Sequence, residues 1–467
     1  MAPRLRFVAS VLDGSMLTRR RLLSAASACA AAAIAVPLLP AADPPPPRAE
    51  DQASAWNAAA LRHRTRRSRL ALLGPAGALP AGTVVRAELE RHAFRFGINL
   101  HPFGVVAPAS QQALEAAVEG VFSAVTVPCY RGQSLYSRLP PYEAERGKPR
   151  REAFRAAASW ARDRGLYVKG HPLLFFREPA WLQSLTPAEQ EAATFAFVRE
   201  ETAAFAGLVQ AWEVLNEPTL GPGQAPKKGA HAIAGVCSRL GTVPALIRAH
   251  AEAATGDPAA ALIINDWVED GRFADIVRGA IAGGARVDAV GLQHHELERH
   301  QKPAARQEVL DRFAALGRPV HLTELMIPSG SNAGRAAFRW KECVWPTTPE
   351  GEARQADEAE TIYRQAFAHP AVDGVTWWDP LDEFACLGVP CGLIRPDGTA
   401  KPVLERLRRL LREEWRSTAT LTADAQGGAE LAGFAGRYRL TAEVAGRRLS
   451  ATVELGADGG PLSARFA

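Results

Sequence analysis

Two carboxylates, Glu217 and Glu324, each stand near the end of a short apolar segment and could act together on a glycosidic bond. Glu217 follows Asn216 in "AWEVLNEP" (211–218), and Glu324 lies in "VHLTEL" (320–325). Two carboxyl groups about 5 Å apart suit double displacement at a sugar, one as acid/base and the other as nucleophile. Burial would raise the pKa of the acid, while hydrogen bonds keep the nucleophile ionised. The Asn216 amide could then bind a sugar hydroxyl beside the reacting carbon.

These two carboxylates are 324 − 217 = 107 residues apart, so a fold must bring them together. Short apolar, β-branched segments alternate with helical stretches rich in Ala, Glu and Arg, a pattern that predicts parallel strands joined by crossover helices. Strand starts from residue 96 to residue 374 cover 374 − 96 = 278 residues in seven intervals of about 40, which suits a (β/α)8 TIM barrel, an α/β fold. The predicted strands are 96–100, 124–127, 167–171, 211–216, 262–266, 289–293, 320–325 and 374–378, and the clearest helices are 110–122, 151–165, 351–369 and 402–415.

An open doubly wound sheet is the alternative architecture. It fits less well because "FGINLHPFG" (96–104) lacks the glycine spacing of a phosphate-binding loop. In a barrel, the carboxyl ends of the strands form the active face, so the polar residues that end the strands become candidates. We interpret Asn265 and Asp266, at one of these ends, as residues that support neighbouring site residues or cap a loop. "HELERH" (295–300) spaces its histidines five apart, whereas a zinc-binding H-E-x-x-H helix needs four.

The N-terminal segment has the layout of an export signal. "LTRRRLLSAASACAAAAIAVPLLPAA" (17–42) begins with arginines and continues as a weakly apolar, Ala-rich stretch. Arg19 and Arg20 before two leucines resemble a twin-arginine signal, which a receptor reads. A single membrane anchor is the alternative. We therefore expect export to the periplasm or beyond, with no stable membrane span after cleavage.

The remaining segments set the predicted domains. A Pro-rich linker, a helix over 53–73 and a strand or hairpin occupy residues 43–93, the catalytic barrel occupies 94–415, and short strands with Gly turns form a small β tail over 416–467. We interpret the basic run "LRHRTRRSRL" (61–70) as a solvated helix face.

Charge and cysteine content exclude several classes of protein. The formal charge is +5, but the first 42 residues hold five arginines and one aspartate, so their removal leaves 5 − 4 = +1. A near-neutral chain gives no electrostatic case for nucleic acid. Cys386 and Cys391 are close enough to form a disulfide if oxidised, and Cys129 is interpreted as a buried thiol. No Cys or His spacing indicates zinc, so we expect no metal or cofactor, and we expect a monomer.

Six blocks of the chain, in order over about residues 94–412, resemble glycoside hydrolase family 10, the xylanase family. "WEVLNEP" is similar to that family's W-D-V-x-N-E-P, and "VHLTEL" to its I-x-I-T-E-L nucleophile strand. "VGLQHH", "KGHPLLFFREPAWL", "IINDW" and "VTWWDPLDEF" resemble further blocks of the same family.

The resemblance implies a retaining glycoside hydrolase that acts on a β-1,4-linked, xylan-like glycan. It implies Glu217 as the acid/base and Glu324 as the nucleophile, with no cofactor. Trp377, favoured over Trp378, would be the aromatic platform under the sugar. The contacts implied near the scissile sugar are His171, Asn216, Gln293 and His295.

Three departures from the family pattern concern sugar binding more than the two-carboxylate chemistry. The E-N-x-x-K-W block is missing near 127–136, its second strand-three His is Phe175 or Phe176, and the Asp of its T-E-L-D is Met326 here. Without that Asp, something else must orient His295. The alternatives are therefore a glycosidase of the same fold with another β-glycan as substrate, and a carbohydrate-binding barrel without turnover.

Overall fold

The computed structural model describes residues 49–132, 139–220, 232–297, 300–330, 347–456 and 459–467. Residues 48–467 form one unit. The predicted export signal lies outside the described residues. Among the helices that are described, none is long and apolar enough to cross a membrane.

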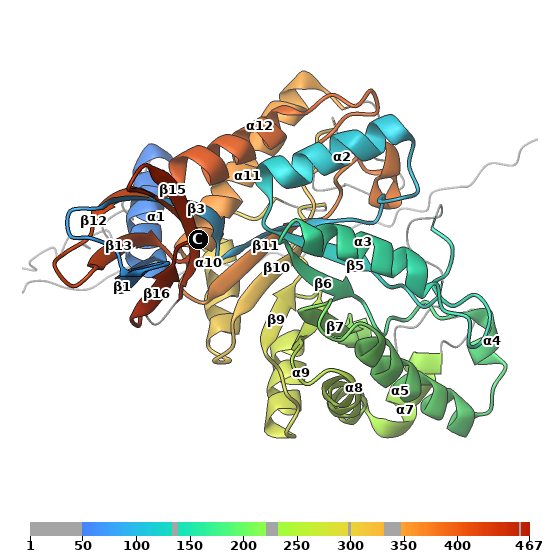
Figure 1. Cartoon of the computed structure of the whole chain (residues 1–467). Helices are drawn as coiled ribbons and strands as arrows, with labels where there is room; N and C mark the ends of the chain where they lie inside the picture. The colour runs from blue at the N-terminus through green and yellow to red at the C-terminus, as the bar shows by residue number, and fades with distance from the viewer. Residues whose placement is uncertain (1–48, 133–138, 221–231, 298–299, 331–346, 457–458) are drawn as a thin grey trace, which may run out of the picture. The chain divides into compact units, whose positions relative to one another are not determined.

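Eight parallel strands close into a barrel in the order β10-β11-β4-β5-β6-β7-β8-β9, with helices around it (Figure 1). The prediction of a (β/α)8 barrel is confirmed, and each predicted strand agrees with an observed one to within two residues at either end. The strand bounds are β4 Arg95–Asn99, β5 Ala124–Pro128, β6 Tyr167–His171, β7 Ala211–Asn216, β8 Ala261–Asp266, β9 Ala289–Leu292, β10 Val320–Leu325 and β11 Val372–Trp377.

The helices around the barrel bury one apolar face each. In α3 (Arg151–Asp163), Phe154, Ala157, Ala158 and Ala161 are buried, a spacing of three and four residues that places them on one side of the helix. The other helices are α2 Pro108–Val121, α4 Ala180–Gln183, α5 Pro187–Ala204, α7 Ala232–Leu240, α8 Thr242–Gly256, α9 Gly271–Ala282, α10 Pro303–Ala314, α11 Pro349–Ala368 and α12 Pro402–Arg409, followed by the helical turn Leu410–Glu414.

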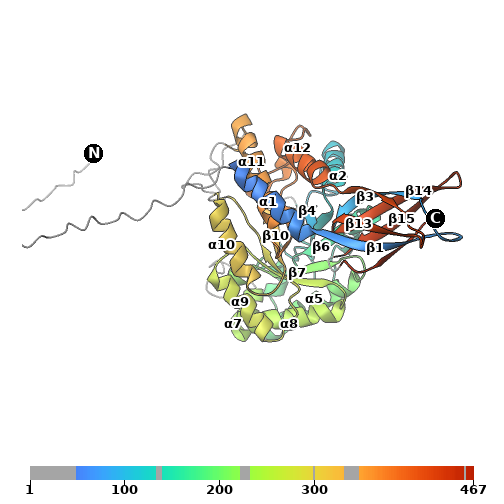
Figure 2. The same ribbon diagram turned by 90° about the vertical axis from the view of Figure 1, so that its left-hand side faces the viewer.

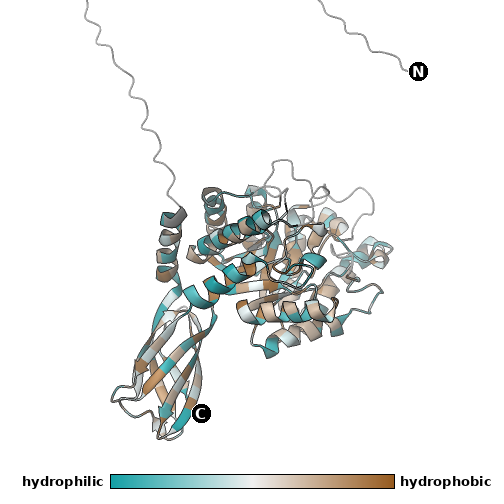
Figure 3. Ribbon diagram, turned by 90° about the horizontal axis from the view of Figure 1, so that it is seen from above, coloured by the Kyte–Doolittle hydropathy of each residue, from teal (hydrophilic) through white to brown (hydrophobic). Residues whose placement is uncertain are grey.

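The N-terminal strands and the C-terminal tail form one structure, which we call the β module (residues 65–92 and 418–465). One sheet has the order β13-β1-β16 with β2 beside β1, and the other has the order β12-β3-β14-β15. Figure 2 shows these strands from the two ends of the sequence side by side, and in Figure 3 they carry both hydrophilic and hydrophobic residues along their length. The strand bounds are β1 Thr65–Gly74, β2 Gly77–Ala78, β3 Val84–His92, β12 Thr418–Thr422, β13 Gly428–Phe434, β14 Gly436–Val444, β15 Arg447–Leu455 and β16 Leu462–Arg465.

The β module corrects two sequence predictions. The N-terminal extension and the C-terminal tail are not separate appendages, because β3 pairs with both β12 and β14. The helix predicted over 53–73 is α1 (Ala49–Arg64), and a strand follows it. Arg67 and Arg69 are exposed while Ser68 and Leu70 are buried, the two-residue period of a strand with one buried face. The arginines Arg67 and Arg69 of the basic run thus lie on the exposed face of a strand and not on a helix face.

Candidate active site

Glu217 lies at the point where β7 ends, in an unusual backbone conformation. Its φ is 58°, in the left-handed region that residues other than glycine rarely adopt and that costs free energy to maintain. Its N–H donates to the carbonyl of Asn265 at 2.8 Å, a bond to the neighbouring strand end that holds the turn. The residue is half-buried, so its carboxyl group keeps access to solvent.

Glu324 lies on β10 and is deeper, with only 4% of its surface exposed. Its Oε1 accepts a hydrogen bond from Nδ2 of Asn265 at 2.7 Å. Its Oε2 lies 3.4 Å from Nε2 of His295, and Nδ1 of His171 lies 3.8 Å from its Oε1. The carboxylate is therefore surrounded by donors from three other strand ends.

A chain of side-chain amides joins the two carboxylates. Oδ1 of Asn216 accepts from Nδ2 of Asn265 at 2.8 Å and from Nε2 of Gln293 at 3.2 Å. Gln293 also donates to Oε1 of Glu217 at 3.0 Å, while Asn265 donates to Glu324. The closed barrel thus brings together residues that are far apart in the sequence. Asn265, predicted from the sequence to support site residues or to cap a loop, donates to both Asn216 and Glu324 and so has the supporting role.

His295 is oriented by the amide chain and not by an acid. Its Nε2 lies 2.9 Å from Oε1 of Gln293, an acceptor, so this nitrogen carries the proton. Among the described residues its buried Nδ1 has no hydrogen-bond partner, at the ring position that the missing Asp leaves open. Burial lowers the pKa of His295 to about 4, so the ring is neutral at pH 7. Gln293 thus orients this histidine in the absence of the acid that Met326 replaces.

A buried ion-pair network that the sequence analysis missed lies behind Glu324. The Glu213 carboxylate contacts both the Lys169 ammonium and Nδ1 of His171, and the Tyr130 hydroxyl lies 3.0 Å from Nε2 of His171. Burial opposes ionisation, but Lys169 and His171 together lower the pKa of Glu213 to about 2. The sequence signal was a charged residue within each of two otherwise apolar strands, Lys169 two residues before His171 and Glu213 three residues before Asn216.

The two candidate catalytic carboxyl groups both bind protons more tightly than free glutamate. Burial raises the pKa of Glu217 to about 7, with Gln293 opposing the rise and Glu324 adding to it. Burial also raises the pKa of Glu324 to about 7, opposed by His171. Because burial and the Glu324 carboxylate both disfavour its ionisation, Glu217 keeps its proton to a higher pH than free glutamate does.

The two adjacent tryptophans, Trp377 and Trp378, make different contacts in the structure. Trp377, the predicted platform, is fully buried, and its indole N–H is directed to the carbonyls of Asp379 at 2.9 Å and Cys391 at 3.1 Å. Trp378 instead packs edge-on against His171, with ring centroids 4.9 Å apart. Trp378, which is also buried with 1% of its surface exposed, thus contacts a member of the carboxylate cluster.

His171, Glu213 and Glu324 have side-chain atoms within 4.8 Å of one another, a spacing that could hold a metal ion. The Lys169 ammonium already contacts Glu213, and the amide of Asn265 donates to Glu324. The negative charge of this cluster is therefore balanced by the chain's own donors.

A family model described as "Glycosyl hydrolase family 10" matches residues 138–388, more than half of the chain. The chain belongs to glycosyl hydrolase family 10. Among curated relatives, anti-sigma-I factor RsgI6 of Acetivibrio thermocellus is 24% identical over 66% of this chain and 37% of that protein. Endo-1,4-beta-xylanase 2 of Arabidopsis thaliana is 27% identical over 58% of this chain and 23% of that protein. The chain thus spans less than half the length of these two relatives.

Other family 10 relatives are covered more fully. An endo-1,4-beta-xylanase of Agaricus bisporus is 27% identical over 54% of this chain and 71% of that protein. The solved structure of xylanase 10B from Thermotoga maritima superposes with a TM-score of 0.55 and 19% identity, covering 69% of this chain and 96% of that one. At this identity the structural likeness shows the shared barrel. Of the family block missing near 127–136, residues 133–136 lie outside the described residues.

Proposed function

We propose that this family 10 chain is a retaining glycoside hydrolase that cleaves β-1,4-linked, xylan-like glycans. The observation that supports this most directly is the pair Glu217 and Glu324, joined by shared amides at the carboxyl ends of β7 and β10. One of the pair has access to solvent and the other is buried among donors. That asymmetry is what an acid/base and a nucleophile require.

In the first step, a carboxylate oxygen of Glu324 forms a bond to the anomeric carbon as the glycosidic C–O bond breaks. Protonated Glu217 gives its proton to the departing oxygen, which leaves as an alcohol. In the second step, the Glu217 carboxylate takes a proton from water, and the resulting oxygen nucleophile displaces Glu324. Two inversions at the same carbon give net retention, and Glu217 is protonated again at the end of the cycle.

The surrounding residues give the two acids different hydrogen-bond partners. Asn265 and His295 hold Glu324 from its two oxygens, which fixes one oxygen toward the sugar. Lys169 and Glu213 fix His171 beside it. Asn216 and Gln293 each have an amide N–H directed at Glu217, so a sugar hydroxyl that enters here would compete for donors that already serve the acid.

An exposed aromatic ring supports a polymeric sugar substrate. Trp267 is 49% exposed and directly follows Asp266, whose carboxylate accepts from the N–H and hydroxyl of Thr219 at 2.9 and 2.8 Å. The ring therefore stands on an anchored loop beside the β7 strand end, and a sugar could stack on it. Several relatives are endo-1,4-beta-xylanases, which favours a xylose backbone.

Replacement of the acid/base tests the mechanism. Glu217→Ala should hydrolyse xylan more than about 10³-fold more slowly, because both proton transfers are lost. It should still form a glycosyl-enzyme from an aryl xylobioside with an acidic leaving group, and added azide should restore turnover with a β-glycosyl azide as product. Glu324→Ala should show neither effect with these substrates. Retention of activity by Glu324→Ala would refute the assignment of the nucleophile. NMR of the first product reports its anomeric configuration and so tests whether the reaction is retaining.

A second candidate function is carbohydrate binding without turnover. It is favoured by the buried, unpartnered Nδ1 of His295 within the described residues and by a relative that is named as an anti-sigma factor. Calorimetry with xylohexaose, followed by product analysis on the same sample, separates the two. Binding without product would replace the hydrolase proposal.

We also propose that the chain is exported. The support is the sequence of residues 17–42 alone, with Arg19 and Arg20 before an Ala-rich stretch. Replacing both arginines by lysines should leave the protein in the cytoplasm of its host if a twin-arginine receptor reads the segment.

A further inference from the structure

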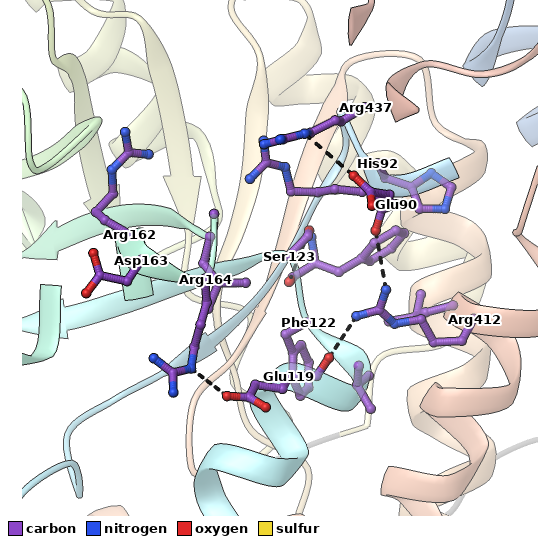
Figure 4. A pocket seen from close by; sticks show the side chains of 16 residues that line it. Glu90, His92, Glu119, Phe122, Ser123, Arg162, Asp163, Arg164, Arg412 and Arg437 are labelled. Carbon is purple, nitrogen blue, oxygen red and sulfur yellow. Dashed lines mark hydrogen bonds and ion pairs between the residues drawn. The ribbon is translucent and has the colours of Figure 1, made fainter. Parts of the chain in front are cut away.

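A cavity of about 620 Å³ lies between the β module and the barrel, at the end of the barrel away from Glu217 and Glu324. Ser123, which precedes β5, and Leu166, which precedes β6, line it, so it lies at the amino ends of the barrel strands. The β module contributes residues of β3 and β14, and the barrel contributes α2, the end of α3 and the turn Leu410–Glu414 (Figure 4). Its size falls within the range of about 300–1,000 Å³ usual for small-molecule sites.

The lining is rich in arginine. Five guanidinium groups face three carboxylates. Within the part of the chain that the structure describes, Arg164 alone among these arginines has a close carboxylate partner, with its Nε 2.5 Å from Glu119. Arg412 donates to the backbone carbonyls of Gly120 and Glu119 at 3.1 and 3.0 Å. The charged residues that line the cavity are Glu90, Arg91, Glu119, Arg162, Asp163, Arg164, Arg412 and Arg437.

Three of these arginines are weakly compensated. Arg437 lies 3.7 Å from Glu90, which also lies 3.2 Å from Arg439 outside the cavity. Arg91 lies 3.8 Å from Glu454. For Arg162, an exposed side chain at the end of α3, no ion pair is formed within the described part of the chain. Contacts at these distances are long for charge-assisted hydrogen bonds, which are about 2.7–2.9 Å.

Two of these guanidinium groups, those of Arg91 and Arg437, lie close to one another, and Arg162 lines the same cavity. A Cβ atom placed on Gly165 would lie 3.3 Å from a terminal nitrogen of Arg91 and 3.9 Å from one of Arg437, so both side chains reach the same point. Burial lowers the pKa of Arg91, and Arg437 and Arg162 lower it further while Glu454 and Glu90 oppose them. Like charges gathered without close partners are unfavourable unless an anion joins them.

We propose that this cavity is a binding site for a small ligand that carries an oxyanion, either a phosphate ester or the carboxylate of a sugar acid, held between Arg91, Arg162 and Arg437. Planar guanidinium groups pair with both oxyanions through two parallel N–H bonds. The ligand bridges the β module and the barrel. The site is separate from the carboxylate cluster and does not depend on the proposed hydrolase activity.

Calorimetry on the full chain at low ionic strength tests this proposal. Inorganic phosphate and glucuronate are the probes, with glucose as the neutral comparison and NaCl at matched ionic strength as the blank. We expect saturable binding of at least one anion and none of glucose. Binding of phosphate alone indicates a phosphate ester, and binding of glucuronate alone or with phosphate indicates that a carboxylate is accepted.

Variants tie the binding to the cavity. The double variant Arg91→Gln/Arg437→Gln should bind the anion at least about tenfold more weakly, since two charge-assisted pairs are lost. Arg162 is exposed, so Arg162→Gln should leave the fold unaffected and weaken anion binding at least about threefold. This variant decides the matter if the double variant does not fold. The matched control is Arg67→Gln, an exposed arginine of the other sheet, which should bind as the parent does. No saturable binding by about 10 mM, a range in which weak ligand sites still saturate, or unchanged affinity in Arg162→Gln, would overturn the proposal.

Discussion

Removing one partner of the buried ion pair between Lys169 and Glu213 should lower the free energy of unfolding far more than replacing both partners together. Both side chains lie inside the barrel, and the Glu213 pKa falls from its usual 4.5 to about 2. A difference of that size corresponds to about 3 kcal/mol in favour of the ionised form at pH 7. Lys169→Met leaves that carboxylate buried with only His171 beside it, so we expect a loss of about 3 kcal/mol in the free energy of unfolding.

The matched variant is Lys169→Met/Glu213→Gln, which leaves no unpaired charge in the network. It should recover at least half of the stability lost by the single variant, because a neutral amide costs less to bury than a lone carboxylate. Urea unfolding followed by tryptophan fluorescence gives the free energies, and the double-mutant cycle isolates the coupling.

The pH dependence has a definite sign. The Glu213 pKa is depressed in the folded state, so the stabilisation is complete above the unfolded value of about 4.5 and is lost as pH falls toward about 2. The difference between parent and Lys169→Met should therefore be constant at neutral pH and shrink below about pH 4.5. A single variant that loses less than about 1 kcal/mol, or a double variant no more stable than the single one, would contradict the interpretation of this network.

Three further predictions concern residues of the barrel. The dependence of kcat/KM on pH should be bell-shaped and centred near neutrality, because burial raises the pKa of both Glu217 and Glu324 to about 7. For aryl glycosides with good leaving groups, Glu217→Gln should remove the alkaline limb of this profile. Asn265→Ala should lower kcat by about 10- to 100-fold while KM changes little, because Glu324 loses its donor at 2.7 Å. Trp267→Ala should raise KM for polymeric xylan several-fold and leave Tm unchanged, since the ring is half exposed. Trp377→Ala should instead destabilise the fold by about 3–5 kcal/mol, because its ring is buried. Equal effects of the two substitutions on Tm would contradict this.

The eight barrel strands could be predicted from the sequence because a parallel sheet is covered on both faces. Its strands are therefore apolar runs that stand out against the helices, and their polar ends mark the active face. Glu217 and Glu324 were found by that pattern and by their neighbours. For Asn265 the sequence left two roles open, because an amide at a strand end has the same appearance whether it caps a loop or supports a site carboxylate, and the structure shows the second.

What the sequence could not provide was register and long-range pairing. The choice between Trp377 and Trp378 depends on which face each residue occupies, and a shift of one residue reverses the answer. The alternating pattern of β3 was read as a strand, but its partners lie in the last fifty residues of the chain. Local periodicity shows that a strand exists and does not identify its neighbour.

The pairing of β3 also constrains how the molecule is made. Its two neighbours, β12 and β14, begin at Thr418 and Gly436, so the ribosome adds the first of them 418 − 92 = 326 residues after β3 is complete. Until then both hydrogen-bonding edges of β3 are bare, a state prone to association with other chains. A chain that ends before β12 would form a barrel whose strand β3 has no partner on either edge. Chaperones or proteases could recognise such a chain by this unpaired strand alone.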